Sequence, residues 1–139
     1  MTKVIFSKIR KQEILLYVFF GALTTFVSFL AYWIALRFGA RLALANTISH
    51  AIAITFAYIT NKIWVFKSLD VSIKVMAKEY IAFFTSRIAT YVLDTLLLIA
   101  LVYMLRISAL LARIFTSALV VILNYVISRK LIFGKNKIM

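Results

Sequence analysis

Three ionisable side chains lie inside long apolar stretches of the sequence, namely Arg87, Asp94 and Arg113. In a helix Arg87 and Asp94 would share one face, with Thr90 and Tyr91 between them. An ionisable side chain at membrane depth is costly and by default suggests a functional site. We expect the two arginines to attract an anionic group such as a phosphate, and Asp94 to hold them when no ligand is bound. The alternative is an internal ion pair that only holds helices together.

Uncharged polar side chains form stripes along the same apolar stretches. Asn124 falls on one helical face with Arg113, and Asn46 lies on the corresponding stripe of an earlier segment, at the position equivalent to Arg113. We expect the amides of Asn46 and Asn124, together with the hydroxyls of Thr90 and Tyr91, to form hydrogen bonds with a polar ligand. Stripes of small and polar residues are also what close packing of membrane helices requires, so packing is the competing interpretation.

A second polar group lies where apolar segments end, and it comprises Asn61, Lys62 and Arg129. Basic residues in such places fix membrane orientation and attract anionic lipid headgroups. The sharper hypothesis is an entrance that collects the phosphate of a lipid carrier, because lysine and arginine supply charge-assisted hydrogen bonds.

The composition indicates which kind of structure holds these residues in place. Of the 139 residues 65% are hydrophobic, and the mean hydropathy is +1.02. A soluble core of this length could not bury so much apolar surface, so the solvent must be lipid. Cysteine and proline are absent from the sequence, which favours long unbroken helices without disulfides.

The net charge of +13 would suggest nucleic acid on a soluble protein. Here the charge lies at the ends of apolar segments, so we expect contacts with anionic lipids and no nucleic-acid partner. The sequence has no glycine-rich phosphate loop and no Cys/His metal spacing. We therefore expect no enzymatic activity, no metal and no cofactor.

Four apolar segments are each long enough to span a bilayer, which needs roughly 20 residues. The sequence thus predicts an all-α membrane protein with a surface helix over residues 2–12 and an interfacial loop over 67–78. The spanning segments are predicted over residues 13–36, 42–66, 79–105 and 109–133.

The basic residues also predict the orientation. They concentrate before Glu13, around the 67–78 loop and over residues 129–137 at the C-terminal end, and are sparse in the two other turns. Because basic flanks stay in the cytoplasm, we expect both termini and the middle loop to face the cytoplasm of a cell membrane.

The two halves of the sequence echo one another at a nearly constant spacing. Tyr58 corresponds to Tyr125, Phe66 to Phe133, and the basic Lys62 to Arg129. Internal repeats of this kind indicate duplicated structural units. We predict two tandem two-helix repeats, residues 13–67 and 79–135, within one transmembrane domain covering residues 1–139.

The segment Asn61-Lys62-Ile63-Trp64-Val65-Phe66, its echo over residues 128–133, and Asn124-Tyr125 resemble the GtrA-like family. Phe20-Gly21 with Thr24 adds to the likeness, which covers nearly the whole chain. The resemblance implies a small four-helix membrane protein that moves polyprenyl-phosphate-linked sugars across the membrane for cell-envelope glycosylation. Ala57 and Ser28 depart from the family pattern, and the acidic residue common in the first helix is instead found as Asp94 in the second half.

Three functions follow as alternatives. The first is translocation of a polyprenyl-phosphate sugar. The second is a non-transporting anchor or assembly partner of a membrane glycosyltransferase. The third is a small drug/proton exchanger, although Glu13 lies at the membrane edge and not at the depth such exchangers use. Four helices leave little room for both a polar route and a packing core, so we also expect a homo-oligomer, most simply a dimer.

Overall fold

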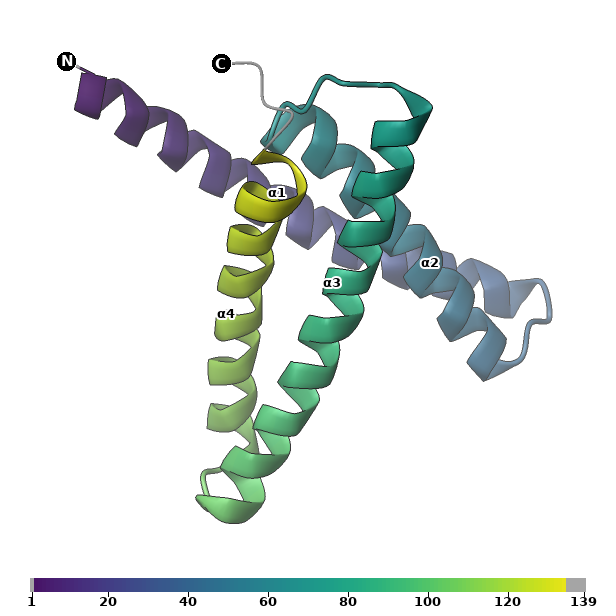
Figure 1. The fold of residues 1–139 in the computed structure, drawn as a ribbon. Helices are drawn as coiled ribbons and strands as arrows, with labels where there is room; N and C mark the ends of the chain where they lie inside the picture. The colour runs from purple at the N-terminus through teal and green to yellow at the C-terminus, as the bar shows by residue number, and fades with distance from the viewer. Residues whose placement is uncertain (1, 135–139) are drawn as a thin grey trace. The chain divides into compact units, whose positions relative to one another are not determined.

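The computed structural model describes residues 2–134, with side chains described from residue 10 onward. Four long α-helices follow one another along the chain (Figure 1). Each is long and apolar enough to cross a membrane. The predicted all-α membrane fold with four spanning helices is therefore confirmed. Between Asp70 and Val71 the chain divides into two compact units, which are described separately.

The first unit is a hairpin of α1 (Thr2–Arg37) and α2 (Leu42–Thr60). Gly39 closes α1 with a φ of +83°, a conformation that glycine adopts without the strain of a Cβ atom. Its N–H donates to the Leu36 carbonyl at 3.0 Å. Residues 2–12, expected to form a separate surface helix, instead continue into the first span as one helix.

The packing face of α2 in this hairpin is a line of small residues. Ala45, Ser49, Ala53 and Ala57 recur every fourth position along α2 and are all buried. Small side chains at this spacing let two membrane helices approach closely, where lipid gives no hydrophobic drive for association. This line of small residues is therefore the face by which α2 packs in the hairpin.

The second unit is a hairpin of α3 (Ile73–Ile99) and α4 (Ala109–Ile127). Ser108 caps α4, since its hydroxyl accepts a hydrogen bond from the Leu111 N–H at 3.4 Å. The helix α3 begins at Ile73 and not at Glu79, because the apolar residues of the expected interfacial loop already lie at helical spacing.

Three of the α-helices end in a single turn of π-helix. These turns are η1 (Asn61–Val65) after α2, η2 (Ala100–Met104) after α3, and η3 (Ser128–Ile132) after α4. At the end of η1 the Phe66 N–H reaches the Asn61 carbonyl at 2.8 Å, and at the end of η3 the Phe133 N–H reaches Ser128 at 2.9 Å. Such turns occur often at functional sites.

The two π-turns η1 and η3 pack in the same way. Phe66 and Phe133 are both fully buried. The ring of Phe66 lies 6.2 Å from Tyr17 at 54°, and the ring of Phe133 lies 6.2 Å from Phe83 at 53°. This agreement supports the tandem-repeat hypothesis, which stays a prediction.

Candidate functional site in the α3–α4 hairpin

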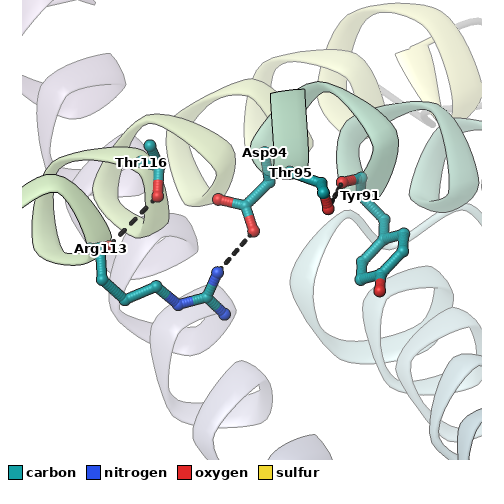
Figure 2. Close-up of polar contacts among 5 residues, drawn as sticks. All are labelled: Tyr91, Asp94, Thr95, Arg113 and Thr116. Carbon is teal, nitrogen blue, oxygen red and sulfur yellow. Dashed lines mark hydrogen bonds and ion pairs between the residues drawn. The ribbon is translucent and has the colours of Figure 1, made fainter. Parts of the chain in front are cut away.

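An ion pair joins the two helices of the second unit within their spanning segments. The Nη1 atom of Arg113 on α4 donates to Oδ2 of Asp94 on α3 at 2.8 Å (Figure 2). The Asp94 side chain is only 11% exposed, whereas that of Arg113 is 59% exposed. A buried carboxylate thus holds a guanidinium that remains accessible from outside the hairpin.

Both members of the pair keep unused hydrogen-bonding capacity. Oδ1 of Asp94 is buried and has no hydrogen-bond partner among the described residues. Nη1 is the only guanidinium nitrogen of Arg113 that bonds to a residue in the described range. Because a guanidinium carries five N–H donors, most of those of Arg113 can still bind an anion.

Arg87 lies on α3 as well, closer than Asp94 to the N-terminal end of this helix. Its guanidinium carbon is 4.4 Å from the centre of the Phe83 ring, on its own helix. The aromatic face attracts the cation and holds it against the hairpin. No contact between Arg87 and Asp94 is recorded, so the direct resting partner of Asp94 is Arg113.

A hydrogen bond between helices lies on the same buried face. Thr90 is buried, and its hydroxyl donates to the Asn124 side-chain oxygen at 2.9 Å. The same hydroxyl also lies 3.0 Å from the Ser86 carbonyl of its own helix. The structure therefore brings together Thr90, Asp94, Arg113 and Asn124 on the facing sides of α3 and α4, with the amide nitrogen of Asn124 still able to donate.

The structure places Tyr91 away from this group. Its side chain is 67% exposed, and Figure 2 shows its ring extending away from the ion pair. Tyr91 directly follows the buried Thr90, and one residue step rotates a side chain by about 100° around the helix, here toward the outside of the hairpin. Tyr91 therefore does not join the other expected donors within this unit.

The three residues of the expected basic entrance, Asn61, Lys62 and Arg129, differ in how deeply they are buried. Lys62 is only 3% exposed, and its Nζ donates to the Ser68 hydroxyl at 3.3 Å. Asn61 is also buried, and its Oδ1 has no hydrogen-bond partner in the part of the chain that is described. The extra residue in the π-turn directs these side chains inward. Lys62 is therefore buried, whereas the sequence predicts a surface cation.

Arg129 of η3 is only half-buried, in contrast to Asn61 and Lys62. Its guanidinium lies 3.5 Å from the Tyr125 hydroxyl, one turn earlier on α4. Arg129 belongs to the second unit, while Asn61 and Lys62 belong to the first. The structure therefore does not establish these three residues as one cluster.

Asn46 lies in the first unit and lines an open groove between α1 and α2. The groove has a volume of about 600 Å³, and Ser28, Tyr32 and His50 also line it. His50 bonds through Nδ1 to the Asn46 carbonyl at 2.9 Å, within its own helix. The polar residues of α2 that line the groove can be noticed in the sequence. Which residues of α1 lie opposite them depends on how the two helices pack.

The family model for the GtrA/DPMS transmembrane domain matches residues 16–133. The chain is 38% identical over 129 residues to the cell wall teichoic acid glycosylation protein GtcA of Listeria monocytogenes, covering 91% of this chain and 88% of that protein. It is 39% identical to the protein of the same name from Listeria innocua, with the same coverage.

A further relative is the uncharacterized membrane protein YwcD of Bacillus subtilis, which is 32% identical over 88% of this chain and 97% of its own length. No solved structure matches the chain. The family match spans all four helices and includes every candidate residue of the α3–α4 hairpin. The chain is therefore a multi-pass membrane protein that belongs to the GtrA/DPMS transmembrane domain family.

Proposed function

We propose that the protein takes part in cell-wall polymer glycosylation by moving a polyprenyl-phosphate-linked sugar across the cytoplasmic membrane. The relatives named as teichoic acid glycosylation proteins support the broader role. The observation that carries the finer proposal is the Asp94–Arg113 pair, which presents an accessible guanidinium inside a spanning hairpin.

The physical difficulty of the task lies in the headgroup. The polyprenyl chain can stay in lipid throughout, but the phosphate and sugar must cross an apolar layer about 30 Å thick. A charged group at its centre is strongly disfavoured unless the protein pairs it. The protein must therefore supply a cation for the phosphate and hydrogen-bonding groups for the sugar.

Arg113 meets the first requirement. It can bind phosphate through its unused donors while Nη1 stays on the Asp94 carboxylate. Asp94 keeps the guanidinium in place between transport events, and so avoids an unpaired cation in the bilayer. Arg87, held on the Phe83 ring, is the second cationic station, and the Asn124 amide is the adjacent donor.

The remaining assignments follow from burial. Arg129 is the proposed phosphate contact at the cytoplasmic end, since Lys62 is buried and bonded to Ser68. Transfer of the sugar to its polymer belongs to a separate membrane glycosyltransferase, and the translocation itself requires no metal or cofactor. The orientation, with both termini in the cytoplasm, rests on the distribution of basic residues.

A variant series in cells tests the proposal. A strain that lacks the protein is complemented with wild type, Arg113→Met, Arg87→Met or Arg106→Met, and envelope glycosylation is measured alongside the amount of protein in the membrane. Arg106 is the matched control, because it is an exposed arginine in the α3–α4 turn. We expect Arg113→Met and Arg87→Met to abolish glycosylation at normal membrane levels, and Arg106→Met to support it. Normal glycosylation by both Arg113→Met and Arg87→Met would contradict the proposal.

A further inference from the structure

A second candidate site lies in the first unit, at the groove between α1 and α2, where several polar side chains interrupt a mostly apolar surface. None of its lining residues is lysine, arginine, aspartate or glutamate. Instead the lining combines side chains that form hydrogen bonds, Ser28, Tyr32, Asn46 and His50, with the exposed ring of Phe29. Its volume of about 600 Å³ falls within the range of small-molecule sites.

The polar groups of this groove are only partly satisfied. The Asn46 amide and the hydroxyls of Ser28 and Tyr32 have no recorded hydrogen bond to a residue in the described range, and His50 uses only Nδ1. These side chains belong to helices that span the membrane, where lipid chains offer no hydrogen bonds. An occupant with hydrogen-bonding groups would therefore be favoured over lipid.

The chemistry of the lining selects the class of occupant. A phosphate would find no cationic side chain here, in contrast to the α3–α4 hairpin. A neutral polyol would find an amide that both donates and accepts, hydroxyls, and an imidazole nitrogen. The Phe29 and Tyr32 rings add flat apolar faces that suit the C–H face of a sugar ring.

The position of the groove fits a headgroup site near one membrane face. Measured from Leu42 at the start of α2, Asn46 lies about 6 Å and His50 about 12 Å along the helix axis. The adjoining α1–α2 turn is the one that the basic residues predict to face outside. We infer that this groove is a sugar-binding subsite that recognises the uncharged sugar of the lipid-linked substrate at the outer face. The inference rests on the proposed function and adds the location at which the protein recognises the sugar.

A binding experiment on the purified full-length protein in lipid nanodiscs tests this. The probes are a ten-carbon isoprenyl phosphate without sugar and the same lipid carrying glucose, galactose or N-acetylglucosamine. The variants are Asn46→Leu, His50→Leu and Thr47→Val. Thr47 is the matched control, because it is an exposed residue of the same helix whose hydroxyl bonds to the Ala43 carbonyl and does not line the groove.

We expect wild type to bind at least one glycosylated probe more tightly than the bare phosphate. Asn46→Leu and His50→Leu should each weaken that binding about tenfold, the effect of losing one or two hydrogen bonds, and leave the bare phosphate unaffected. Thr47→Val should bind like wild type. Equal affinity for all four probes, an equal loss for bare and glycosylated probes, or a change of oligomeric state in the variants would overturn the inference.

The same assay separates this inference from the proposed function. Arg113→Met should weaken binding of the bare and glycosylated probes alike, because it removes a phosphate contact. If Arg113→Met leaves the bare phosphate unaffected, the proposed phosphate station fails. The sugar subsite is then still tested by whether Asn46→Leu and His50→Leu weaken binding of the glycosylated probes and not of the bare phosphate.

Discussion

At the scale of single residues, Asp94 and Arg113 illustrate what a sequence can and cannot specify. Both were identifiable as candidates because ionisable side chains are costly in an apolar segment. Their direct pairing was one option among several, since Arg87 was an equally plausible partner for Asp94 by helical spacing. The choice depends on how α3 and α4 pack, and that packing leaves Arg87 on the Phe83 ring.

The burial of Lys62 could not be predicted in the same way. A lysine at the end of an apolar segment ordinarily extends to the headgroups. Here the π-turn directs it inward to the Ser68 hydroxyl. The hydrogen bond from Thr90 to Asn124 likewise joins two residues that were individually noticed but whose contact only the packing decides.

The Asp94–Arg113 pair should appear as an energetic coupling. We predict that a double-mutant cycle with Asp94→Asn and Arg113→Met gives an interaction free energy of about 1–3 kcal/mol, measured by reversible unfolding in mixed detergent micelles. A parallel cycle with Asp94→Asn and Arg106→Met should give additive effects. Additivity in both cycles would show that the ion pair contributes nothing to the fold.

Thr90 should stabilise the hairpin through its bond to Asn124. Thr90→Val keeps the shape of the side chain but removes the donor, so we expect a loss of about 0.6–1.7 kcal/mol in the free energy of unfolding. Thr95→Val is the control, because the Thr95 hydroxyl bonds to the Tyr91 carbonyl of its own helix on an exposed face. Equal effects of the two substitutions would argue against the interhelical bond.

At the scale of elements, the four spans and most of their ends were predictable, whereas the starts of α1 and α3 were not. Apolar length without proline specifies a helix, so the spans emerged close to their observed positions. The start of α3 was missed because amphipathic residues 73–78 resemble an interfacial loop as much as a first helical turn. The π-turns were missed because a single shifted hydrogen bond leaves no periodicity in the sequence.

The end of η3 offers a sharp test of this local geometry. A Cβ atom on Gly134 would lie 2.9 Å from the Arg129 carbonyl oxygen, whereas one on Gly21 would meet nothing within 4 Å. We predict that Gly134→Ala lowers the midpoint of thermal unfolding in detergent. Gly21→Ala, inside a helix, should leave it unchanged or raise it through a gain of about 0.5–1 kcal/mol. The reverse order would contradict the described geometry.

At the scale of the whole molecule, the sequence predicts an orientation and a dimer. Orientation follows from charge asymmetry, and the native chain has no cysteine to complicate labelling. Phe38→Cys should react with a membrane-impermeant thiol reagent in intact cells, and Leu69→Cys only after permeabilisation. Both positions are exposed, at 88% and 56%, whereas the neighbouring Ser68 is buried. Labelling of Leu69→Cys from outside would refute the orientation.

The dimer follows from the shortage of space that four helices leave for a polar route. We predict that native mass measurement in gentle detergent or nanodiscs gives two copies of the chain. A monomer that still translocates substrate would contradict this, and would mean that one chain provides the whole route.

The most direct test of the central claim is translocation by this protein alone. Purified protein is placed in liposomes with a labelled isoprenyl-phosphate sugar, and the fraction exposed outside is followed with an impermeant sugar-modifying reagent. We predict that wild type equilibrates the probe between leaflets, while Arg113→Met stays close to protein-free liposomes and Arg106→Met behaves as wild type. If correctly inserted wild-type protein moves no probe, the protein is instead an anchor or assembly partner of the glycosyltransferase. Equal transport by the Arg113→Met variant would likewise contradict the account.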